Sequence, residues 1–157
     1  MKYLSSKLHT SYYMISSLKN LMSPYVLRTT YFACFHVHLR YGLNLWGSDP
    51  ESIRIFRLQK KVIRKIRKAG QHASCRNLFK DLNVFPLPCL YISEVVCCVK
   101  SDKEKVKYNE VHDHCTCQKS DLHIQFCRTT LFKNSSANVV IKLYNKLPNT
   151  IKRLQKI

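Results

Sequence analysis

In the stretch IRIFRLQKKVIRKIRKAG, residues 53–70, aliphatic residues lie between eight Lys and Arg residues. At about 100° per residue, the turn of an α-helix, most of its apolar side chains fall on one arc and its cationic side chains on the opposite arc. Only Ile53 lies on the wrong side. The stretch therefore predicts an amphipathic helix whose apolar arc faces the core. That arc contains Ile55, Phe56, Leu58, Val62, Ile63, Ile66 and Ala69.

The opposite arc carries positive charge alone. Solvated helix faces usually mix signs, because opposite charges four residues apart stabilise a helix, yet the only acidic residue nearby is Glu51. The whole chain has 27 Lys and Arg against 9 Asp and Glu, a formal charge of +18. Such a surplus repels itself unless a polyanion binds, and nucleic acid gains affinity by releasing counterions. We therefore predict phosphate contacts from Arg54, Arg57, Lys60, Lys61, Arg64, Lys65, Arg67 and Lys68.

The remaining sequence predicts an all-α protein. Apolar residues at helical spacing indicate helices at 3–21, 24–41, 75–83, 90–99 and 138–147, besides the basic helix over 49–69, which starts at Asp49-Pro50 and ends at Gly70. Three glycines in 157 residues argue against a turn-rich β architecture. We predict a single helical domain of about six helices. Residues 101–125 form a long polar loop in it, and residues 126–157 form a helical tail that packs on residues 1–100.

No segment of the sequence has the features of a signal peptide or a membrane span. The first twenty residues contain no uninterrupted apolar segment, and no run reaches the ~18 apolar residues that a membrane helix needs. We therefore expect no membrane partner and a reducing compartment, nuclear or cytoplasmic. In such a compartment most of the eight cysteines are thiols.

A cluster of histidines and cysteines lies between residues 112 and 127. Zinc takes four such ligands, so one hypothesis is a structural zinc site. The spacing is irregular and contains no CxxC, and the HxHCxC segment cannot place all its members around one ion without strain. We therefore favour an incidental cluster and expect no cofactor in this chain. The zinc hypothesis would use His112, His114, Cys115 and Cys117.

Six stretches cover nearly the whole chain in order: LSSKLHTSYYMISSLKNL, YFACFHVHLRYGLNLWG, RIFRLQKKVIRKI, SCRNLFKDLNVFPLPCLYISEVVCCVK, SDLHIQFCR and IKLYNKLPNTIK. Together they resemble the C-terminal part of the reverse transcriptases encoded by non-LTR retrotransposons, most closely jockey-type mobile elements. Gln59, Lys60, Lys61 and Arg64 match that family's LQKKAIR-like pattern. The family's YNTR-like motif is HCTC here, with Cys115 and Cys117 in place of Asn and Arg.

In that family these segments follow the catalytic palm and look like the helical thumb and the region after it. The resemblance therefore implies that residues 1–100 are thumb-like. It also implies that the partner is an RNA–DNA or DNA duplex held through its phosphates, with the polymerase palm as a second partner.

Polymerisation needs two metal ions held by paired carboxylates, which the family keeps on a palm hairpin with two adjacent aspartates. This sequence has no two adjacent acidic residues. We therefore predict a fragment of an RNA-directed DNA polymerase that has no catalytic residue and is not an enzyme on its own, since magnesium would belong to the missing palm. Three alternatives stay open: a stand-alone nucleic-acid- or zinc-binding helical module, a helical interaction protein, and a mobile-element remnant without a selected function.

Overall fold

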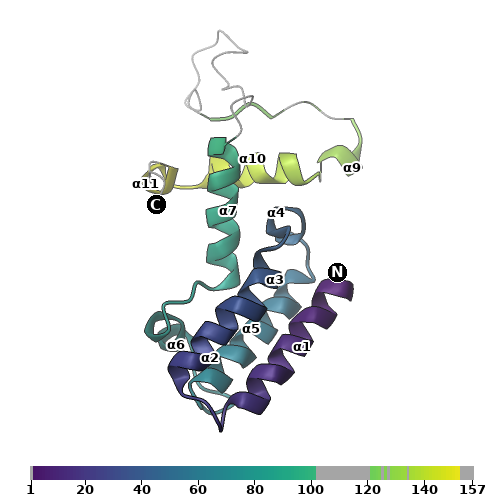
Figure 1. The fold of residues 1–157 in the computed structure, drawn as a ribbon. Helices are drawn as coiled ribbons and strands as arrows, with labels where there is room; N and C mark the ends of the chain where they lie inside the picture. Colours follow the sequence, from purple (N-terminus) through teal and green to yellow (C-terminus); the bar gives the residue numbers. More distant parts are fainter. Residues whose placement is uncertain (1, 102–120, 125, 127, 134, 153–157) are drawn as a thin grey trace. The chain divides into compact units, whose positions relative to one another are not determined.

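The computed structural model describes residues 2–101, 121–124, 126, 128–133 and 135–152. Every regular element in this part of the chain is helical, so the all-α prediction is confirmed. The chain forms two compact units, residues 1–91 and 92–157 (Figure 1). The packing of the tail on the first 100 residues stays a prediction. Nearly all of the predicted polar loop lies outside the described residues.

The first unit is built from helices joined by short turns. They are α1 (Lys2–Leu18), α2 (Pro24–Thr30), the π-helical segment η1 (Tyr31–His36), α3 (Val37–Arg40), α4 (Leu43–Trp46), α5 (Ser52–Ile66), α6 (Cys75–Asp81) and the start of α7 (Leu87–Ser101). Ser23 caps α2, because its Oγ accepts a hydrogen bond from the Val26 N–H, and Pro24 takes the first helical position. Gly42, with φ of 62°, ends the run of α2, η1 and α3.

Helix α5 packs along α1 in this unit (Figure 1). The predicted apolar arc faces the core, while Phe56 and Ala69 are half-buried and Ile53 keeps 55% of its surface exposed. Side chains from α1, α2, η1, α3, α4, α6 and the start of α7, with those of Leu82 and Val84, complete the core. The α5 residues buried there are Ile55, Leu58, Gln59, Val62, Ile63 and Ile66.

The ends of α5 differ from the predicted range 49–69. At the start, the prediction of Asp49-Pro50 was wrong, since α5 begins at Ser52 and Glu51 takes the N-cap position. Asp49 Oδ1 accepts a hydrogen bond from the Glu51 N–H at 2.8 Å in the turn before the helix. At the other end, the prediction that Gly70 ends the helix was wrong. Lys68 takes the left-handed conformation there instead, with φ of 51°. The Ala69 N–H donates to the Arg64 carbonyl and the Lys68 N–H to the Lys65 carbonyl. These bonds form a Schellman motif, which closes the helix two residues before the glycine.

Gln59 is the polar residue at the centre of this core. Its side chain is fully buried, and its Nε2 donates to Tyr31 Oη and to the Phe85 carbonyl, each at 3.0 Å. Its Oε1 accepts from the Leu87 N–H at 2.9 Å. A buried amide is tolerated only when its polar atoms are paired. Gln59 therefore fastens η1 and the segment before α7 to α5.

The phenol of Tyr31 should make stability fall at alkaline pH. Burial raises the pKa of Tyr31 from 10.0 to about 12, an effect that the Gln59 hydrogen bond partly offsets. Between these values the unfolded tyrosine has lost its proton while the folded one keeps it, so unfolding releases a proton. The free energy of unfolding should then fall by about 1.4 kcal/mol per pH unit from pH 10 to 12.

Urea unfolding at a series of pH values measures this slope. Tyr31→Phe is the control, because it keeps the ring and the many lysines but cannot ionise. Equal slopes for the two proteins above pH 10 would contradict the assignment to Tyr31.

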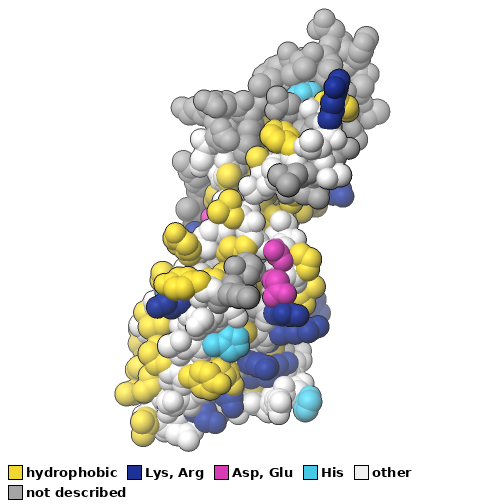
Figure 2. All heavy atoms as spheres, turned by 90° about the vertical axis from the view of Figure 1, so that its right-hand side faces the viewer, with side chains coloured by type: hydrophobic (Ala, Val, Ile, Leu, Met, Phe, Trp, Pro, Cys, Tyr) yellow, Lys and Arg dark blue, Asp and Glu magenta, His cyan; other side chains and the backbone are white. Residues whose placement is uncertain are grey.

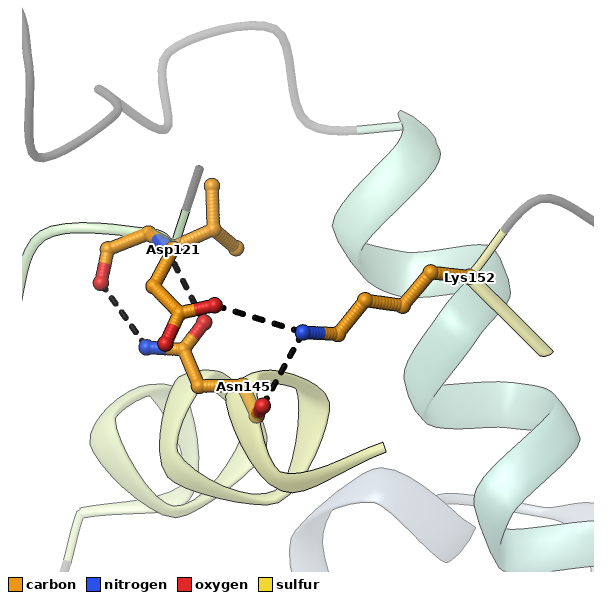
Figure 3. Close-up of polar contacts among 4 residues, drawn as sticks. Asp121, Asn145 and Lys152 are labelled. Atoms are coloured by element: carbon orange, nitrogen blue, oxygen red, sulfur yellow. Dashed lines mark hydrogen bonds and ion pairs between the residues drawn. The ribbon is translucent and has the colours of Figure 1, made fainter. Parts of the chain in front are cut away.

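The second unit contains the rest of α7 and the helices α9 (Thr130–Lys133), α10 (Ser136–Lys146) and α11 (Asn149–Lys152). Figure 3 shows how residues 121 and 122 are held to it. The Asn145 side chain pairs with both backbone groups of Leu122, accepting at 3.0 Å and donating at 2.9 Å. Lys152 Nζ donates to the Asn145 carbonyl at 2.9 Å and forms an ion pair with Asp121 at 3.3 Å. These contacts join two stretches that lie more than twenty residues apart in sequence.

Among the described residues, no helix is both long and apolar enough to cross a membrane.

Candidate nucleic-acid interface

All eight predicted cationic residues lie on α5 or in the turn that follows it, and none is buried. They belong to the first unit, and Figure 2 shows Lys and Arg side chains gathered on one face of that unit. Lys60, Arg64 and Lys65 are half-buried and the others are exposed. The structure therefore brings the predicted residues together on α5 and the turn that follows it, where their spacing in the sequence predicted a helix.

Four of these cations contact other groups of the protein. Arg64 Nε donates to the Ala73 carbonyl at 2.9 Å, and Lys60 Nζ lies 4.2 Å from the centre of the Phe56 ring. Two more form ion pairs at 3.1 Å, Arg54 with Glu51 and Arg67 with Asp81. A phosphate that binds one of these four cations therefore competes with a contact that the side chain already makes within the protein.

The other four cations have no ion pair or hydrogen bond within the part of the chain that the structure describes. Three of them, each four residues from the next, follow one another along one side of α5, and the fourth, Lys68, lies in the turn after the helix. At 1.5 Å per residue the helical part of this set, from residue 57 to residue 65, is about 12 Å long, the rise of about 3–4 nucleotides along one strand of a duplex. We call this set the free row: Arg57, Lys61, Lys65 and Lys68.

Two recesses flank α5, and cations line both. A groove of about 790 Å³ lies on the α1 side, where Arg54, Arg57 and Lys61 stand opposite Ser5 and His9. The ion pair between Arg54 and Glu51, which also lines the groove, offsets one of these charges. A recess of about 550 Å³ lies on the α6 side. The free row thus borders the first of these hollows.

The alternative zinc site cannot be placed. His112, His114, Cys115 and Cys117 all lie outside the described residues. Within the described residues, no group of three or more His, Cys, Asp or Glu side chains could hold a metal ion. The described cysteines are free thiols: Cys34, Cys75, Cys89, Cys97 and Cys98.

The sequence did not show that Arg64 and Arg67 would contact residues distant in the chain. The partners of Arg64 and Arg67 are a carbonyl nine residues away and a carboxylate fourteen residues away. Gln59 shares a sequence pattern with Lys60 and Lys61, yet it turns into the core. The only feature of the sequence that indicated the burial of Gln59 was its position beside Leu58 and Val62 on the helical wheel.

Searches of protein-family models, of curated proteins and of solved structures find no match for this chain. The case for a nucleic-acid interface therefore depends on the geometry and charge of α5 together with the sequence resemblance.

Proposed function

We propose that this chain binds a nucleic-acid duplex, RNA–DNA or DNA, through the phosphates that contact the outer face of α5. The observation that carries the proposal is the free row: three cations on one side of α5 and a fourth, Lys68, in the turn after it, none of which forms an ion pair in the described part of the protein. Unpaired like charges at this spacing repel one another and destabilise a helix slightly. A phosphate chain lying along the row removes that repulsion and releases its counterions.

The rigidity of α5 favours this function. Five aliphatic residues anchor its inner face, and the Gln59 network fixes its middle. The cations of the free row therefore extend from a backbone that does not have to be ordered on binding, which lowers the entropy cost of association. Contacts of this kind position a duplex without reading its sequence.

The resemblance to non-LTR retrotransposon reverse transcriptases supports a finer proposal. In it, the chain is the thumb-like, non-catalytic part of an RNA-directed DNA polymerase, and it holds template and primer beside a palm that supplies the magnesium site. Lys61 belongs both to the family-like LQKK pattern and to the free row. Lys60 and Arg64, from the same pattern, contact Phe56 and Ala73. These two side chains therefore contribute to packing as well as to duplex binding.

Binding of an RNA–DNA hybrid should weaken steeply with salt and depend little on sequence. Each neutralised phosphate contributes about −0.9 to the slope of log K against log salt concentration, so the four cations of the free row predict a slope of about −3.6 or steeper. Fluorescence anisotropy with a labelled hybrid at several salt concentrations measures this slope. Hybrids of the same length but scrambled sequence should bind within about threefold of one another. A flat salt dependence, or a strong preference for one sequence, would show that the proposal is wrong.

A further inference from the structure

The recess on the α6 side of α5 combines an apolar floor with a cationic rim. Its volume of about 550 Å³ lies within the ~300–1,000 Å³ of sites that take small molecules. No Asp or Glu side chain of the described residues lines it. All of its lining residues belong to the first unit: Phe56, Lys60, Arg64, His72, Ala73, Ser74, Cys75, Arg76, Phe79 and Pro86.

The floor of the recess suits a flat, apolar ring. The rings of Phe56 and Phe79 stack with an interplanar angle of 25°, and because Phe79 is buried it fixes the half-buried Phe56. Lys60 Nζ lies over the Phe56 ring, 4.2 Å from its centre, so a base that stacks on this ring has to displace the ammonium group, which then stays beside it. Aromatic side chains beside cations are the combination with which proteins hold unpaired bases and their phosphates.

The rim of the recess suits a phosphate. The hydrogen bond from Arg64 Nε to the Ala73 carbonyl fixes the guanidinium at the wall and uses one of its five N–H donors. Arg76 on α6 is exposed and supplies a second guanidinium. Because no carboxylate lines the recess, neither cation meets a competing charge there.

From this geometry we propose that the α6-side recess binds one unpaired nucleotide of a bound nucleic acid. Its base lies against Phe56, and its phosphate lies between Arg64 and Arg76. Lys60 in the recess and Lys61 in the free row are consecutive residues and lie about 100° apart around α5, so a strand that leaves the row crosses the outer face of the helix to reach the recess. This inference rests on the proposed function and narrows its substrate to a duplex with a single-stranded extension.

Two probes test the inference: a blunt RNA–DNA hybrid and the same hybrid with a short single-stranded extension. The unmodified full-length protein should bind the extended probe about tenfold more tightly, the effect of burying one stacked base. Arg76→Gln should remove most of this advantage. Lys80→Gln is the matched control, because it removes one positive charge from an exposed position of the same helix but outside the recess. It should leave the advantage unchanged.

Ser74→Phe tests the same site without changing charge. Ser74 is exposed, lines the recess and makes no capping hydrogen bond to α6, so a larger side chain there fills the recess at little cost to the fold. It should abolish the advantage of the extended probe while affinity for the blunt hybrid stays within about twofold. Circular dichroism of each variant checks that the helices are intact.

Three results would overturn the inference. They are equal affinity of the unmodified protein for both probes, equal effects of Arg76→Gln and Lys80→Gln, and competition by inorganic phosphate as effective as that by adenosine monophosphate. The last would mean a simple anion site. None of these results contradicts the proposed function, which is tested separately by the salt dependence of binding and by the effect of the free row on affinity for the blunt hybrid.

Discussion

Replacing Gln59 with leucine is expected to lower the free energy of unfolding by about 3–5 kcal/mol, although leucine is apolar and of similar size. The substitution removes three hydrogen bonds at once. It leaves the Tyr31 hydroxyl, the Phe85 carbonyl and the Leu87 N–H without their partner. Each unpaired buried group costs about 1–3 kcal/mol, and the new methyl groups recover part of that sum.

Urea unfolding followed by tryptophan fluorescence measures the effect. Trp46 is the single tryptophan and lies in the core of the same unit, with 9% of its surface exposed. Tyr31→Phe is the graded control, because it removes only one of these bonds and should cost about 1 kcal/mol. If Gln59→Leu costs no more than that control, the amide does not hold the segments together.

Changing Arg57, Lys61 and Lys65 together to glutamine should weaken binding of an RNA–DNA hybrid by about tenfold to a hundredfold at low salt. None of the three has an ion pair or hydrogen bond in the described part of the protein, so their loss should leave the fold intact. The slope of log K against log salt concentration should become shallower by about 2.7, the share of three phosphates.

A second triple variant separates this effect from a general loss of charge. Lys7, Lys19 and Lys80 lie on α1, in the turn after it and on α6, and changing them to glutamine also removes three positive charges. That variant should change affinity by less than about threefold. Equal losses in the two triple variants would mean that diffuse charge, and not the face of α5, attracts the nucleic acid.

Much of the fold could be predicted from the spacing of apolar residues. The wheel of residues 53–70 identified the buried face of α5 and the misplaced Ile53, because a helix repeats every 3.6 residues whatever it packs against. The helix predicted at 24–41 does start at Pro24, with Ser23 as its cap, since capping depends on residues a few positions apart. The predicted start at Asp49-Pro50 was early, because α5 begins at Ser52. The end of α5 was missed, because Lys68 accepts a left-handed conformation that glycine would adopt more easily.

The sequence by itself determined that the protein is helical and that one of its helices has an apolar face and a cationic face, because both properties depend on neighbours three and four residues apart. The contacts of Arg54 with Glu51 and of Lys60 with Phe56 are also local, three and four residues apart. Tertiary structure alone decided that Arg64 and Arg67 contact other groups of the protein as well. Arg64 and Arg67 find their partners in Ala73 and Asp81, beyond the end of their own helix, while the side chains of the free row find none among the described residues. Contacts of this kind form only when the chain folds back on itself, so they cannot be predicted from the spacing of neighbouring residues.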